Sequence, residues 1–143
     1  MITPNITEDP YAAFSEYLKA THPSMFQNYS ACEVGTGWFK VIKSLCQGID
    51  DYTSWKNKEF TRTGQVVEPV VVQQIKEKFG HLRFYYRGGD DYVHGMVQMA
   101  EKWANETCDQ CGATGTRRAG GWIRTLCDEH EAQRRQRTTE DDE

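Results

Sequence analysis

Residues 107–130 read TCDQCGATGTRRAGGWIRTLCDEH and contain two closely spaced pairs of potential metal ligands. The ligands are Cys108, Cys111, Cys127 and His130. Two residues separate the members of each pair, and this spacing lets one tight turn present both side chains to the same ion. A structural zinc takes four nitrogen or sulfur ligands in a tetrahedron, whereas a catalytic zinc keeps one position open. The stretch therefore predicts one structural Zn²⁺ per chain.

The residues around these ligands predict a compact finger. Gly112 follows the first pair, where a metal-binding knuckle needs a positive φ. The runs 114–118 and 122–126 flank Ala119-Gly120-Gly121 and predict a short β-hairpin. A helix is expected over residues 127–137. A knuckle, a hairpin and a helix that begins at a ligand resemble a treble-clef zinc finger.

Upstream of the finger, apolar periodicity predicts three helices. Asp9-Pro10 marks the start of a helix that ends near Thr21. Gly35-Thr36-Gly37 precedes a second helix, and Asp90 or Asp91 caps a third. The second helix has its apolar face at Trp38, Val41, Ile42, Leu45, Cys46 and Ile49. The third has its apolar face at Tyr92, Val93, Met96, Val97, Met99, Ala100, Trp103 and Ala104.

The segment between the second and third helices is harder to interpret. Residues 66–72 are rich in valine, which favours a strand, but Pro69 lies in the middle. We favour a helix that starts at Pro69, ends at Phe79 and is capped by Gly80. A strand is expected over 82–86, with alternate residues facing the core.

The polar stretch before this segment, from Tyr52 to Gly64, predicts a loop with Trp55 against the core. Taken together, the elements predict an α+β protein with three or four helices, a small antiparallel sheet and the C-terminal finger. We expect a helical core region over 1–106, a docked finger over 107–137 and a flexible acidic tail over 138–143.

Composition indicates in which cellular compartment the protein is expected and to which broad class it belongs. The chain has 143 residues, a net charge of −4 and five cysteines. The first residues lack a basic segment and an apolar run, so no signal peptide or membrane span is expected. In the reducing cytoplasm, cysteines point to metal binding rather than disulfides. Cys46 is expected in the core, and Cys32 has no assigned role.

Basic residues are nevertheless concentrated in two places. Residues 76–87, KEKFGHLRFYYR, interleave basic and aromatic side chains, a mixture that can hold phosphates and stack bases. The candidate residues for contact with a nucleic acid or another partner are Lys76, Lys78, Arg83, Arg87, Arg117, Arg118 and Arg124. The alternative is that the aromatic side chains pack the core while the basic groups stay solvated. The acidic total also weighs against a nucleic-acid binder.

No catalytic motif stands out. Asp50-Asp51 and Asp90-Asp91 are adjacent pairs, which point in different directions on a helix, and His81 and His94 are isolated histidines. Gly35-Thr36-Gly37 offers backbone N–H groups to an anion, but it lacks the third glycine and the lysine of nucleotide loops. Helix capping explains it better, and the protein is expected to be non-enzymatic.

Three blocks of sequence carry a resemblance. They are Gly35-Thr36-Gly37-Trp38 with Leu45-Cys46, QIKEKFGHLRFYYRGG from Gln74, and the zinc block from Thr107. Together they resemble a group of small bacteriophage and prophage proteins. The resemblance implies a phage or bacterial cytoplasmic context and no particular activity.

The leading expectation is a zinc-stabilised interaction protein, a phage accessory factor that binds a host protein. The alternative is an accessory factor that binds nucleic acid through residues 76–87 and the finger arginines. A third possibility is an enzyme whose site is assembled from distant residues. The sequence names neither the partner nor the oligomeric state.

Overall fold

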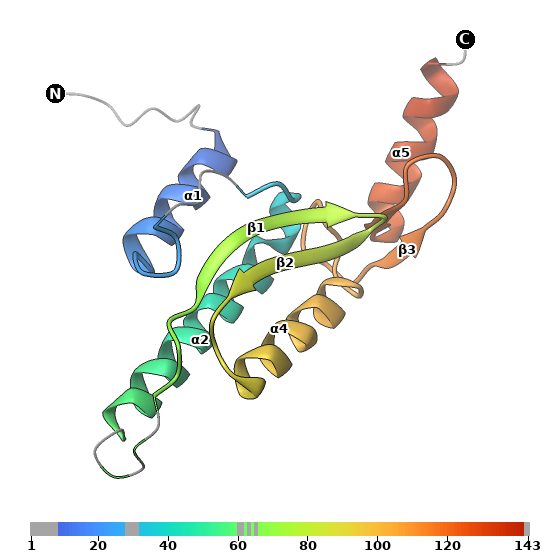
Figure 1. Ribbon diagram of the computed structural model, residues 1–143. Helices are drawn as coiled ribbons and strands as arrows, with labels where there is room; N and C mark the ends of the chain where they lie inside the picture. Colours follow the sequence, from blue (N-terminus) through green and yellow to red (C-terminus); the bar gives the residue numbers. More distant parts are fainter. Residues whose placement is uncertain (1–8, 28–31, 60–61, 63, 65, 142–143) are drawn as a thin grey trace, which may run out of the picture.

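Helices and two small antiparallel sheets alternate along the chain (Figure 1). The computed structural model describes residues 9–27, 32–59, 62, 64 and 66–141. The elements are α1 (Pro10–Thr21), the short 3₁₀ helix η1 (Thr36–Trp38), α2 (Phe39–Lys58), β1 (Val71–Lys78), β2 (His81–Arg87), α4 (Asp91–Ala104), β3 (Thr116–Arg118), β4 (Arg124–Leu126) and α5 (Asp128–Asp141). This composition confirms the predicted α+β class.

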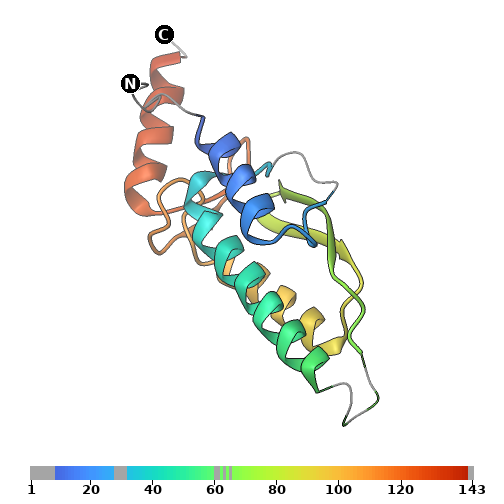
Figure 2. The same ribbon diagram turned by 90° about the vertical axis from the view of Figure 1, so that its left-hand side faces the viewer.

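The core lies between the β1–β2 hairpin and the helices. α4 packs against β2, and α2 packs against α4 (Figures 1 and 2). The hairpin contributes Val72, Ile75, Leu82 and Phe84 to the core, all of them buried. All six apolar residues predicted for the second helix are buried too. Within the described part, no helix combines the length and apolarity needed to cross a membrane.

The helix predicted from Pro69 to Phe79 is wrong, because this segment forms β1. β1 pairs antiparallel with β2, and an irregularity between Val72 and Gln74 inserts one extra residue. The bulge places buried Val72 and Ile75 three residues apart, a spacing that imitates a helix. Phe79 and Gly80 both have positive φ, 54° and 81°, so they form the tight hairpin turn rather than a helix cap.

The predicted loop from Tyr52 to Gly64 is also wrong over its first part. α2 continues to Lys58, because no glycine or proline interrupts it there. Trp55 is 57% exposed and does not lie against the core. At the other end of the chain, the predicted tail is helical as far as Asp141.

The two N-terminal helix caps predicted from aspartates are confirmed. The Asp9 carboxylate accepts the N–H of Tyr11, and the Asp90 carboxylate accepts the N–H of Val93. The predicted apolar face of α4 is only partly correct. Val93, Val97, Ala100 and Ala104 are buried, whereas Tyr92, Met99 and Trp103 are exposed.

The finger docks on the start of α2 by close backbone contact. The N–H of Gly37 donates to the Asp109 carbonyl at 2.8 Å, and the indole N–H of Trp38 donates to the Thr107 carbonyl at 2.8 Å. A Cβ atom at Gly35 would lie 2.1 Å from the Asp109 carbonyl oxygen. Only glycine permits such an approach, so Gly35-Thr36-Gly37 forms a docking surface for backbone.

The finger also contacts the turn of the β1–β2 hairpin. The buried Thr125 hydroxyl donates to the Gly80 carbonyl at 2.7 Å. Arg117 Nε donates to the Phe79 carbonyl at 3.0 Å. The finger therefore joins two parts of the core, the start of α2 and the hairpin turn, that are far apart in sequence.

We predict that Gly37→Ala lowers the free energy of unfolding by about 1–3 kcal/mol. The new Cβ would lie 2.1 Å from the Cys108 carbonyl oxygen and 2.6 Å from the Gly112 nitrogen, and backbone atoms cannot rotate away. Gly95→Ala is the control, since nothing lies within 4 Å of its Cβ. In the middle of α4 it should gain up to about 1 kcal/mol. Equal stability of Gly37→Ala and wild type in chemical denaturation would contradict the docking.

Candidate metal centre

The four predicted ligands converge on one point. One ligand atom from each of Cys108, Cys111, Cys127 and His130 lies within 4.8 Å of all the others. The Cys111 and Cys127 sulfurs are 3.9 Å apart. His130 Nδ1 lies 3.6 Å from the Cys108 sulfur and 3.2 Å from the Cys127 sulfur. These residues are close enough to hold one metal ion.

A knuckle turn presents the first ligand pair. The Gly112 N–H donates to the Cys108 carbonyl at 2.9 Å, which closes the turn, and Gly112 has a φ of 84° as predicted. The Ala113 N–H points at the Cys111 sulfur at 3.4 Å. Cys108 is buried and Cys111 is exposed, so the centre lies at the edge of the molecule.

The second pair comes from the junction between β4 and α5. β4 ends at Leu126, Cys127 follows, and His130 lies in the first turn of α5. The Cys127 carbonyl accepts the Glu131 N–H at 2.9 Å, the first bond of the helix. The His130 N–H approaches the Cys127 sulfur at 3.4 Å. The helix start thus sets the distance between these two ligands.

A partly buried ion pair between Arg124 and Asp109 supports the knuckle. The Arg124 guanidinium donates to both oxygens of the Asp109 carboxylate, at 2.6 and 3.3 Å. Asp109 is 4% exposed, and its N–H donates to the Thr125 carbonyl. A bidentate pair of this kind fixes orientation as well as charge. Arg124 therefore holds the knuckle against β4.

The electrostatics of the centre favour a cation. Burial raises the pKa of the Cys108 thiol, but backbone N–H groups, that of Cys127 foremost, outweigh burial and lower the pKa to about 7. At Cys111 the Ala113 N–H lowers the pKa, but desolvation and the two neighbouring thiols raise it above its usual value. The thiolates repel one another, and one bound cation removes that repulsion.

The structure separates the predicted basic residues into two sets. Lys76 lies directly opposite Arg83 on the hairpin, facing away from the buried Ile75–Phe84 pair. Lys78 and Arg87 lie at the finger end and the far end of the same hairpin. Within the described part, none of these four residues takes part in an ion pair.

The finger arginines form ion pairs and hydrogen bonds with other residues of the same chain. Arg118 pairs with Asp128 at 2.7 Å and lies 3.8 Å from Glu131, and Arg124 pairs with Asp109. Arg117 donates through Nε to the hairpin turn. The structure thus brings Arg117 to the finger end of the hairpin, and it leaves Arg118 and Arg124 as braces of the finger.

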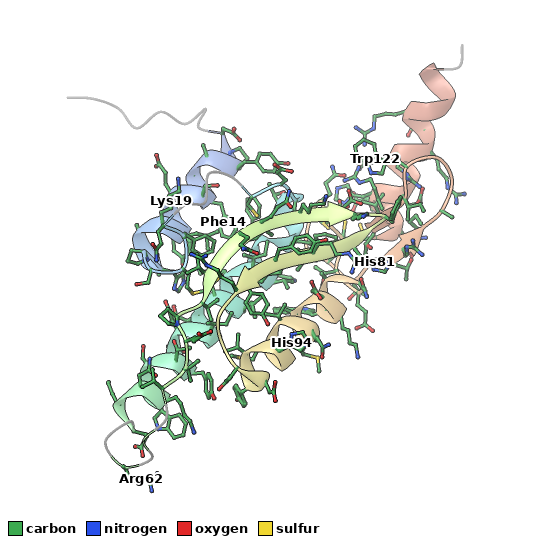
Figure 3. All side chains as sticks on the ribbon, viewed as in Figure 1. Phe14, Lys19, Arg62, His81, His94 and Trp122 are labelled. Atoms are coloured by element: carbon green, nitrogen blue, oxygen red, sulfur yellow. The ribbon has the colours of Figure 1, made fainter. Side chains whose placement is uncertain are left out.

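The aspartates and histidines considered as catalytic candidates form hydrogen bonds with other side chains of the fold. Asp50 bonds the buried His22 and so ties the end of α1 to α2. Asp51 accepts from Gln47, and Asp90 accepts the Tyr52 hydroxyl. His81 bonds Asn105 at 2.8 Å, and His94 bonds the Tyr86 hydroxyl at 3.2 Å. Figure 3 shows His81 near the finger and His94 on α4, so the two histidines belong to different places.

Sequence reasoning missed the partners that support the ligands. Nothing in the ligand spacing marks Asp109, yet it is the buried partner of Arg124. Trp38 reads as a core residue only, yet its indole bonds the backbone next to Cys108. The sequence Gly35-Thr36-Gly37-Trp38 is the one feature that could have indicated this contact, since two glycines so close together allow tight backbone packing.

No family profile matches the chain, and comparison with curated proteins and with solved structures found no match either. We therefore derive the function from the residues themselves.

We predict that metal affinity falls with decreasing pH, and more steeply below about pH 7. A thiol must lose its proton to bind a metal. Cys111, with its raised pKa, carries a proton throughout the neutral range and contributes about a tenfold loss per pH unit. Cys108, with a pKa of about 7, adds a further proton to this dependence only below that pH. Competition with a chromophoric chelator measures the slope, and one constant slope through neutrality would contradict this assignment.

Proposed function

We propose that this protein is a zinc-stabilised, non-enzymatic interaction protein that carries one structural Zn²⁺. The observation that carries the proposal is the convergence of four protein ligands within 4.8 Å of one another. A centre filled by four protein side chains has no open position for a substrate. The ion therefore contributes to folding, and binding is left to the surface.

The donor set and its dimensions support zinc. Three soft thiolates and one imidazole suit Zn²⁺, which is a borderline-soft ion. Zn–S bonds of about 2.3 Å and a Zn–N bond of about 2.0 Å imply tetrahedral S···S edges of about 3.8 Å and S···N edges of about 3.5 Å. The separations of 3.9, 3.6 and 3.2 Å lie close to these values. Knuckle, hairpin and ligand-bearing helix support a treble-clef-like finger.

We further propose that the protein is a phage-encoded accessory factor that acts on a host protein in the bacterial cytoplasm. The resemblance of three sequence blocks to phage and prophage proteins supports the context. The acidic net charge of −4 supports a protein partner over a nucleic acid. The bonds that occupy Asp50, Asp51, Asp90, His81 and His94 support a non-enzymatic role.

We predict about one equivalent of zinc in the purified protein by elemental analysis. Cys111→Ser should release the metal and lower the melting temperature, because metal bound only by the folded state contributes to folding. Cys46→Ala is the matched control, since Cys46 is buried in α2 outside the ligand set, and it should keep its zinc. A fully folded, metal-free preparation of the wild-type chain would contradict the proposal.

Affinity capture from bacterial lysate, with and without nuclease, tests the interaction itself. A host protein identified by mass spectrometry that stays bound after nuclease treatment is the expected result. Capture that disappears with nuclease would replace the protein partner with a nucleic acid.

One observation favours the alternative, a nucleic-acid-binding accessory factor. Lys76 and Arg83 lie directly opposite each other on the outer face of the hairpin. Like charges in this position repel, which a phosphate would relieve. Exposed Tyr85 and Phe79 lie on the same hairpin and offer rings for stacking. Against this, Glu33 pairs through its backbone with Lys76 and brings an acidic residue beside the cluster.

The leading proposal predicts no binding of short single- or double-stranded DNA or RNA at low salt and tens of micromolar protein, where basic nonspecific binders still bind. Titrations of wild type, Arg83→Glu and Lys19→Glu decide the matter. Lys19 on α1 is a control for the change in charge (Figure 3). Salt-sensitive binding that Arg83→Glu removes and Lys19→Glu keeps would favour the alternative.

A further inference from the structure

The apolar face of α4 is wider than its contact with the core. Tyr92, Met99 and Trp103 are 61%, 67% and 41% exposed. Their spacing of seven and four residues places them on one side of the helix. We call these three residues the α4 stripe. It runs for about 16 Å, or three helical turns. Large apolar side chains gathered in this way on a surface mark a binding site more often than isolated ones do.

α2 runs beside α4 and widens this surface (Figure 2). Between the two helices lies an open groove with a volume of about 570 Å³. Its lining consists of Gly48, Asp51, Tyr52, Trp55, Tyr92 and Met96, which we call the aromatic groove. A Cβ at Gly48 would lie 3.5 Å from the Met96 sulfur and would fill part of the groove, so the glycine leaves this space open.

The rings of the aromatic groove are held in place before any partner arrives. Tyr52 stacks on Tyr92 with ring centroids 4.3 Å apart, and Trp55 lies 6.5 Å from Tyr52. The Tyr52 hydroxyl donates to the Asp90 carboxylate at 2.5 Å. Preordered rings bind with a smaller loss of side-chain entropy than mobile ones. Exposed tyrosine and tryptophan are also the residues that most often dominate the energy of protein interfaces.

The charges around the groove indicate the partner's chemistry. Asp51 lines the groove, and Asp91 is exposed at the start of α4 beside Tyr92. Lys56 and Lys58 lie in the last turn of α2, and the Lys56 ammonium is 5.8 Å from the centre of the Trp55 ring. Lys56 shows that the Trp55 ring accepts a cation at its face. Rings beside carboxylates are complementary to an arginine or lysine side chain.

The same charges argue against other occupants. A second copy of this chain bound face to face would bring a second set of the same carboxylates, Asp51 and Asp91, into the interface. The phosphates of a nucleic acid or of an anionic membrane would be repelled by Asp51 and Asp91. A basic segment with apolar side chains meets both features of the surface.

We propose that the aromatic groove and the α4 stripe bind a basic amphipathic helix of a partner protein. An arginine or lysine of that helix lies over the rings of Tyr52 and Trp55 beside Asp51, and its apolar side chains pack along Met99 and Trp103. This inference rests on the proposed function of the protein as an interaction protein, and it names the surface and the chemistry of the partner.

The test uses the zinc-loaded full chain and two synthetic helical peptides. Each peptide has about 18 residues, long enough to form a helix. One combines leucine with arginine, and the other has glutamate in place of every arginine. Amide chemical shifts report where each peptide binds. The arginine peptide should shift α2 and α4 resonances around the groove, and the glutamate peptide should not bind.

Charge-reversal variants make the test specific. Asp51→Lys should weaken binding of the arginine peptide roughly tenfold, because it replaces attraction with repulsion beside the bound cation. Glu16→Lys makes the same change on exposed α1 and should leave the affinity unchanged. Equal effects of the two variants would reduce the binding to attraction by net charge and overturn the proposal.

Three other outcomes would also overturn it. They are shifts confined to the hairpin or finger, equal binding of both peptides, and a concentration-dependent dimer in sedimentation that Tyr92→Ser abolishes. The last would assign the surface to a second copy. If neither peptide binds but a nuclease-resistant partner is captured from lysate, only the assignment of the groove as the binding site is overturned. Loss of that capture with peptide binding intact counts against the proposed function.

Discussion

The contact between the Gly35–Gly37 backbone and the knuckle carbonyls fixes where the finger lies on the core. Gly37 donates to Asp109, one residue after the ligand Cys108, and Trp38 donates to Thr107, one residue before it. A side chain at either glycine would collide with backbone. The metal ligands and the start of α2 are therefore held by the same few residues. A change in the shape of the knuckle must be transmitted to α2.

The parts of the fold that follow local rules could be predicted from sequence. Ligand spacing, Gly112 and the Asp9 and Asp90 caps each depend on a few adjacent residues. β1 could not be predicted, because its bulge disguises a strand as a helical pattern. The support of Cys108 by Trp38 and by the Asp109–Arg124 pair depends on contacts between distant segments, which spacing along one chain does not reveal.

Charged and apolar side chains are distributed in the structure differently from the distribution that the sequence pattern predicts. The finger arginines that resemble a phosphate-binding cluster include two braces, Arg118 and Arg124, each in an ion pair. The α4 residues that resemble core include the exposed α4 stripe. Polar groups thus rigidify the inside of the finger, and apolar groups remain at the surface. This distribution supports the proposed role as a zinc-stabilised interaction protein.

Amide hydrogen exchange before and after treatment with a chelator tests the proposed structural role of zinc most directly. The account predicts that chelation removes protection from the knuckle and also from the Gly37 amide and the Trp38 indole, which bond to it. The Glu33 amide, which bonds to the Ile75 carbonyl in the core, should keep its protection and serves as the internal control. Protection that persists at Gly37 and Trp38 while residues 108–130 exchange freely would contradict the account.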